Sequence, residues 1–103
     1  MITNITARHF KAWPELHDSA IEAANGFAKY NESITRTDII LSEDNGKSVE
    51  FTVHVNGHTF HGEATGDDFD KAIHGASDKI IVQLRKLKEK LTNHKGHDIL
   101  DGQ

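Results

Sequence analysis

Hydrophobic residues in the last third of the chain recur at steps of three or four. This period places side chains on one face of an α-helix. The members of the stripe are Phe69, Ile73, Ala76, Ile80, Leu84, Leu87 and Leu91. Asp67 stands where an N-cap belongs, with Asp68 and Asp70 in the first turn. Gly96 lies near the far end of the pattern. The sequence therefore predicts an amphipathic helix from Asp68 to about Asn93, with one buried face.

A second helical pattern begins at Pro14, in the first third of the chain. Proline suits the first turn of a helix, because an amide hydrogen at that position would have no hydrogen-bond partner within the helix. The apolar stripe that follows consists of Leu16, Ala20, Ala23, Phe27 and Tyr30. We expect a helix to about Tyr30, weakened by about 1 kcal/mol at Gly26. Trp13 is expected to pack at the entry to this helix.

Between the two helices, and before the first, the pattern is that of β-strands. Residues 1–7 alternate isoleucine with polar residues, and Ile34–Ser42 is rich in isoleucine and threonine. A polar turn at residues 43–46 leads to strict alternation of apolar and polar residues from Val49 to Val55. Asn56-Gly57 then predicts a type I′ hairpin, because both central residues of that turn need a positive φ.

A two-residue turn fixes the register of the strand that follows it. The expected opposite pairs are Val55–His58, Val53–Phe60, Phe51–Gly62 and Val49–Ala64. This register places the large apolar side chains on one face, where Gly62 and Ala64 leave room for helices to pack closely. The other face is expected to be wet; it carries Glu50, Thr52, His54, Thr59, His61 and Glu63.

The order of elements is therefore strand, helix, three strands, helix. It predicts an α+β fold, a β-α-β-β-β-α two-layer sandwich with two helices on one face of a four-stranded sheet. With 103 residues, of which 36% are hydrophobic, the chain suits one small domain. We expect residues 1–95 to form this domain and residues 96–103 to be a flexible C-terminal tail.

Composition narrows the chemistry. The chain has no cysteine, so neither a disulfide framework nor a thiolate metal site is available. No stretch approaches the apolar length of a membrane span, and the N-terminus lacks the pattern of a signal peptide. We therefore expect a cytoplasmic protein without a membrane partner, cofactor or metal. The sequence also lacks a Walker loop, a nucleophile elbow and a dinucleotide fingerprint, so we expect no enzyme activity and no small-molecule substrate.

Charge is distributed unevenly along the chain. The net charge is −4, yet residues 85–97 carry five Lys/Arg against one glutamate, a local +4. Because salt screens charges beyond roughly 8 Å under physiological conditions, a basic patch can act locally on a chain that is acidic overall. A solvated helix face is the simpler alternative on charge alone.

The geometry of the last helix favours a role for these charges. At 1.5 Å per residue the helix is about 40 Å long, whereas a seven-residue strand spans about 23 Å. Its basic end should therefore extend beyond the sheet. Lys86, Lys90 and Asn93 fall on one stripe, which Lys79 and Arg85 flank. Lys29, near the end of the first helix, joins them if the two helices converge.

One long stretch resembles a known family. It runs from His54 to Leu91 and reads HVNGHTFHGEATGDDFDKAIHGASDKIIVQLRKLKEKL. It is similar to the hairpin and second helix of the ribosome hibernation promoting factors, also called ribosome-associated inhibitor Y or sigma-54 modulation proteins. The opening ITARHF and a tyrosine before the second strand fit the same family. The resemblance extends to about residue 95.

The resemblance implies a translation inhibitor without catalytic activity. Such a factor binds 16S rRNA of the small ribosomal subunit in the decoding channel, blocks the sites of messenger RNA and tRNA, and stores ribosomes during starvation. The matching RNA-binding positions are Arg8, Lys29, Lys79, Arg85, Lys86, Lys88, Lys90 and Lys95. Relatives often have further basic residues in the first helix, and Val82 replaces one that can occur in the second. The chain resembles the short form, which lacks a C-terminal dimerisation domain.

Two other functions remain as alternatives. The acidic outer face of the sheet, with Glu50 and Glu63, could bind a basic protein partner. Metal-assisted hydrolysis by the hairpin histidines ranks third. His54 and His61 are diagonal neighbours at roughly 7 to 8 Å, too far apart for an ideal shared zinc ion, and His58 lies on the opposite face.

Overall fold

The computed structural model describes the backbone of residues 1–96 and the side chains of residues 1–88. Its elements are β1 (Ile2–Arg8), α1 (Pro14–Phe27), β2 (Ile34–Glu43), β3 (Lys47–Val55), β4 (His58–Gly66) and α2 (Phe69–Gly96). This order confirms the predicted β-α-β-β-β-α fold. Gly96 is the last residue of α2, and the rest of the predicted tail lies outside the described residues.

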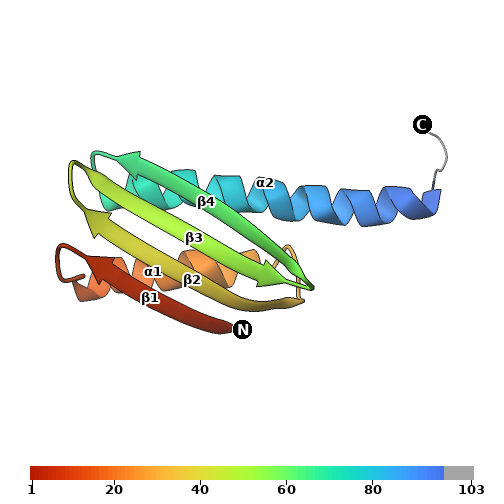
Figure 1. Cartoon of the computed structure of the whole chain (residues 1–103), viewed down its shortest axis with the longest axis horizontal. Coiled ribbons are helices and arrows are strands. Elements are labelled where there is room, and N and C mark those ends of the chain that lie inside the picture. The colour runs from red at the N-terminus through yellow and green to blue at the C-terminus, as the bar shows by residue number, and fades with distance from the viewer. Residues whose placement is uncertain (97–103) are drawn as a thin grey trace.

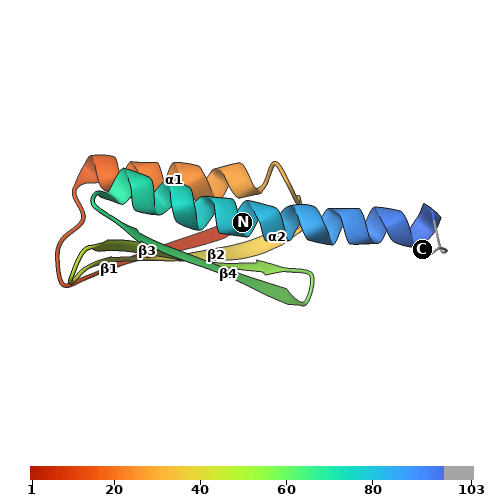
Figure 2. The same ribbon diagram turned by 90° about the horizontal axis from the view of Figure 1, so that it is seen from above.

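The four strands form one sheet in the order β1-β2-β3-β4. β1 pairs with β2 in parallel, and the other two pairs are antiparallel. Both helices cover the same face of this sheet and run side by side in the same direction (Figures 1 and 2). The architecture is therefore the two-layer sandwich that the sequence predicts.

The hairpin between β3 and β4 has the predicted turn and register. Asn56 and Gly57 have φ values of 44° and 81°, the positive pair that a type I′ turn requires. All four expected opposite pairs occur, from Val55–His58 at the turn to Val49–Ala64. The register confirms that the apolar side chains of both strands face the helices.

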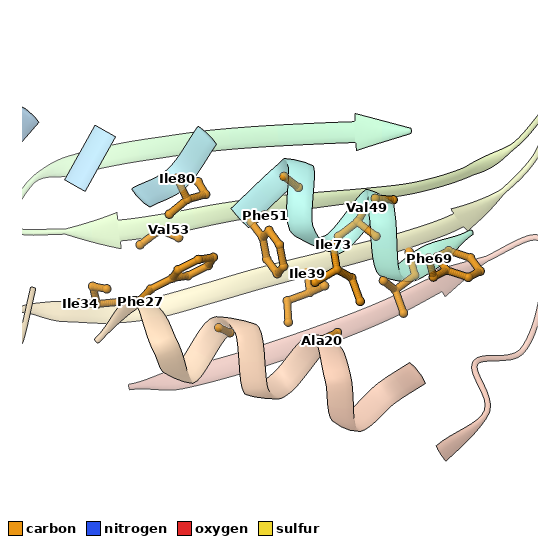
Figure 3. Packing of buried hydrophobic residues seen from close by; sticks show 14 of the residues in the cluster. Ala20, Phe27, Ile34, Ile39, Val49, Phe51, Val53, Phe69, Ile73 and Ile80 are labelled. Carbon is orange, nitrogen blue, oxygen red and sulfur yellow. The ribbon is translucent and has the colours of Figure 1, made fainter. Parts of the chain in front are cut away.

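A continuous apolar core fills the space between the sheet and the helices (Figure 3). Phe27 of α1 and Phe51 of β3 meet edge to face near its middle, with ring centroids 5.1 Å apart. Gly62 allows the close approach of α2, since a Cβ atom there would lie only 2.8 Å from the carbonyl oxygen of Ala76. The prediction that small residues in β4 make room for a helix is thus confirmed.

Three details of the helices differ from the sequence prediction. The N-cap of α2 is Asp68 rather than Asp67, because Asp68 Oδ1 accepts a 2.8 Å hydrogen bond from the Lys71 amide. β4 continues to Gly66, which moves the start of the helix by one residue. In α1, Ala24 is fully buried while Ala23 is only partly so. That helix ends at Phe27, and a turn carries the chain to Tyr30, whose amide donates to the Phe27 carbonyl.

Proline at the first position of α1 is confirmed. Trp13, just before it, packs as expected at the helix entry: its ring lies 5.8 Å from that of Phe69, edge to face. Phe10 stacks on Phe69, with ring centroids 5.1 Å apart, and also meets Trp13 edge to face. These aromatic contacts join the first residue of α2 to the segment between β1 and α1. In the described part of the chain, no helix is long and apolar enough to span a membrane.

Candidate nucleic-acid interface

The C-terminal end of α2 projects beyond the sheet and beyond α1 (Figures 1 and 2). The helix has 28 residues, which corresponds to about 42 Å, whereas the nine residues of β4 span about 30 Å. β4 ends at Gly66 and α2 begins three residues later, at the same end of the sheet. The additional length of the helix therefore lies at the opposite end. The molecule is accordingly elongated, with extents of 51 × 25 × 18 Å. The predicted overhang is confirmed.

Basic side chains lie where the projection begins. Arg85, Lys86 and Lys88 are all exposed. Among the side chains of residues 1–88, no carboxylate lies within 4 Å of any of these three charged groups. Lys90 and Lys95 continue the helix, but their side chains lie outside the described residues. The base of the projection therefore presents positive charge to solvent.

Lys29 lies next to this charge, because the end of α1 meets the middle of α2. The Arg85 guanidinium stands over the ring of Tyr30, 5.6 Å from its centroid. Lys29 precedes that tyrosine in the turn after α1 and is exposed. A cation over an aromatic face is held by the quadrupole of the ring. The two helices run parallel as the sequence analysis required, but the end of α1 meets the middle of α2 rather than its C-terminal end.

Lys79 takes a different position. Its ammonium donates a 2.6 Å hydrogen bond to the Glu63 carbonyl, on the outer edge of β4. One turn further along α2, the Gln83 side-chain amide donates to the His61 carbonyl at 2.9 Å. These two contacts satisfy carbonyl groups that an edge strand would leave to water. Lys79 thus attaches α2 to the sheet, as does Gln83, whose contact could not be predicted from the sequence.

Arg8 does not lie near the basic residues at the base of the projection. It lies at the end of β1 opposite Ser42, on the sheet face away from the helices. A small hollow there is lined in part by Arg8, Glu50 and Glu63. This end of the sheet is the one near Phe69, where α2 begins, and the basic overhang is at the other end (Figure 1).

Sequence comparison decides the family. The profile described as "Sigma 54 modulation protein / S30EA ribosomal protein" matches residues 3–92 of the chain. The chain belongs to this family. The match thus includes α1, the sheet apart from Ile2, and α2 as far as Thr92.

Individual S30EA relatives agree with this assignment. The ribosome hibernation promoting factor of Escherichia coli strain K12 is 32% identical over 95 residues, which cover 91% of this chain and all of that protein. The factor of the same name from Klebsiella oxytoca is 30% identical over the same coverage.

Solved structures show the same fold. A ribosomal subunit interface protein from Coxiella burnetii is similar with a TM-score of 0.80 and 23% identity, covering 86% of this chain and 99% of that one. The N-terminal domain of Thermus thermophilus Protein Y follows, with a TM-score of 0.73 and 19% identity over 82% and 94% of the two chains. Both solved structures therefore share the fold of this chain.

Charges on the outer face of the sheet are largely paired with one another. Asp38 accepts hydrogen bonds from Arg36 at 3.0 Å and from Asn4 at 3.1 Å, and its Oδ2 lies 3.3 Å from His54 Nε2. The hydrogen bond from Arg36 lowers the pKa of the Asp38 carboxyl; partial burial acts the other way, and the bonds from Asn4 and His54 add to the lowering. This carboxylate is held within the sheet rather than presented to a partner.

The second pair on that face joins His61 to Glu50, with 2.7 Å between Nε2 and Oε2. His54 and His61 therefore contact different carboxylates instead of converging. Within the described part of the chain, no three His, Asp or Glu side chains are grouped closely enough to hold a metal ion. Glu63 lies directly opposite Glu50 and is exposed. The acidic face that the rival hypothesis requires is thus interrupted by three basic or titratable side chains.

Proposed function

We propose that this protein is a ribosome-associated translation inhibitor. It binds 16S rRNA in the decoding channel of the small subunit and blocks the sites of messenger RNA and tRNA by occupying them. The relatives named ribosome hibernation promoting factor support the ribosome as the partner. The observation that carries the RNA-binding mode is the projecting end of α2 with its exposed basic side chains.

A projecting helix is well shaped for insertion into RNA. Its diameter with side chains is about 10–12 Å, and long lysine and arginine side chains extend the reach of their charges to phosphates. Each phosphate neutralised releases condensed counterions, so binding should depend steeply on salt. The acidic residues of the far end lie beyond a Debye length of roughly 8 Å from the projection in a molecule 51 Å long. Repulsion of RNA by the carboxylates of that end is therefore screened at the projection.

Inhibition by occupation requires binding but no chemical step. The groups that we assign to RNA contact are Lys29, Arg85, Lys86 and Lys88, together with Lys90 and Lys95 further along the helix. Lys79 contributes less because its ammonium already donates to the Glu63 carbonyl. Arg8 would contact RNA only if the bound strand also reached the opposite face of the sheet.

A pair of matched charge reversals tests the proposal. Lys86→Glu/Lys88→Glu changes two exposed residues of the projection, and Lys11→Glu/Lys71→Glu changes two exposed lysines at the far end. Both variants alter the net charge by the same amount. We expect the first to bind 30S subunits much more weakly in cosedimentation and the second to bind like the wild type, with unchanged circular dichroism for both. Undiminished binding by the first variant would contradict the proposal.

A further inference from the structure

A hollow opens between the tip of the β3–β4 hairpin and α2, where the helix begins to project. It has a volume of about 260 Å³ and is lined by His58, Phe60, Gln83, Lys86 and Leu87. The tip of the hairpin diverges from the helix in this region (Figure 2). The hollow therefore adjoins the basic side chains at the base of the projection and shares Lys86 with them.

One wall of the hollow is a pair of stacked rings. His58 and Phe60 are two residues apart in β4, so both side chains emerge on the face toward the helices. Their ring centroids are 6.0 Å apart and their planes differ by 20°. His58 is exposed and Phe60 half-buried, while Leu87 of α2 is also only partly covered. The result is a flat, largely apolar surface that is open to solvent.

The charge around the hollow suits one class of ligand. Its lining includes the cation Lys86 and no carboxylate. Three other hollows in the described part of the chain each include at least one carboxylate: Asp68 and Asp70 in the first, Asp78 in the second, and Glu50 and Glu63 in the third. An apolar ring surface beside a lysine complements a flat heterocycle that carries an adjoining anion.

Unpaired nucleotides have that chemistry. RNA-binding proteins stack unpaired bases on phenylalanine, tyrosine and histidine side chains, and a neighbouring cation holds the phosphate. We propose that this hollow receives one unpaired base of an RNA strand, stacked on the His58–Phe60 pair, while Lys86 contacts the adjoining phosphate. The inference rests on the proposed function and deepens it, because it adds a site for a single-stranded nucleotide to the electrostatic contacts of α2.

The test compares two RNA strands of equal charge. The first is an unstructured octanucleotide and the second is the same backbone with abasic positions throughout. The full-length protein should bind the first strand about 5- to 150-fold more tightly, the range expected for one stacked base. His58→Ala and Phe60→Leu should each remove most of this preference. The salt dependence should stay unchanged, because neither substitution removes a phosphate contact.

His74→Ala is the matched control, because it removes an exposed histidine that lies on α2 and does not line the hollow. It should keep the full preference. Phe60 packs against the core, and leucine is chosen because it keeps most of the side-chain volume. His58 is exposed, so its replacement tests the site without a loss of core packing. Equal affinity of the wild type for both strands would overturn the inference, as would a preference that survives in both His58→Ala and Phe60→Leu.

Cosedimentation with 30S subunits separates the two proposals. If the wild type binds the subunit but shows no base preference, the base site is wrong and the proposed function stands. If it shows the preference but does not bind the subunit, the proposed function is wrong and the base site stands.

Discussion

Gly62→Ala should destabilise the protein through a single added methyl group. The new Cβ would lie 2.8 Å from the Ala76 carbonyl oxygen, 3.1 Å from Lys79 Cβ and 3.2 Å from Ile80 Cγ1. The oxygen belongs to the backbone of α2, so the clash cannot be relieved by a change of side-chain rotamer. The helix must instead move away from β4, and the contacts of Lys79 and Gln83 with the edge of that strand must lengthen.

The expected cost follows from two opposing terms. Overpacking a close contact costs about 1–3 kcal/mol. Replacing glycine by alanine restricts the unfolded chain and recovers about 0.4–1 kcal/mol. We therefore expect a net loss of about 1–2 kcal/mol in the free energy of unfolding. For a domain of this size that lowers Tm by about 4–16 °C.

Gly26→Ala is the matched control, because the same chemical change there should have the opposite sign. Among the described residues, no atom outside its immediate surroundings in α1 lies within 4 Å of a Cβ at Gly26. The backbone is helical, so alanine should stabilise by about 0.5–1 kcal/mol. Urea denaturation followed by circular dichroism measures both variants. A Gly62→Ala variant as stable as the wild type would refute the close packing of α2 on β4.

Two further predictions concern aspartates. Asp68→Ala should cost about 1 kcal/mol in urea denaturation because the Lys71 amide loses its cap, whereas Asp67→Ala should change stability by less than half of that; equal effects would argue against the assigned N-cap. Asp38 has a folded-state pKa below its unfolded value, so its contribution to stability is present above the unfolded pKa of about 3.9 and is lost as pH falls further. Asp38→Asn should therefore lose less stability than the wild type between pH 4 and pH 2, and parallel acid profiles would contradict the hydrogen bond with Arg36.

The sequence was sufficient for the elements and for the β3–β4 register. Asn56-Gly57 allows only a short turn, and the alternation from Val49 to Val55 leaves one choice of buried face. Local rules of this kind need no knowledge of distant residues. The overhang of α2 was also predictable, since it follows from helix rise and strand length alone.

What could not be predicted depends on contacts between distant segments. Lys79 flanks the helical stripe that contains Lys86, and only the position of β4 beneath the helix reveals that its ammonium donates to the Glu63 carbonyl. Arg8 has the same charge as Lys29, yet the direction of β1 takes it to the opposite face and the opposite end. The charged residues of the sequence are thus candidates for RNA contact, and only the tertiary structure shows which of them lie close together.

Asp67 and Asp68 illustrate a smaller ambiguity. Two adjacent aspartates are equally good N-cap residues, and the choice between them depends on where β4 ends.

Cosedimentation with 30S subunits across a salt series tests most directly whether the projecting end of α2 carries RNA binding. If Lys29, Arg85, Lys86 and Lys88 each contact a phosphate, these four alone give a log–log slope of about −3.6, which corresponds to an affinity loss of about 150-fold between 50 and 200 mM salt. Lys86→Glu/Lys88→Glu should bind more weakly, with a slope shallower by about two units, whereas Lys11→Glu/Lys71→Glu should match the wild type. A wild-type slope near zero, or equal losses in the two variants, would contradict binding through this end of the helix.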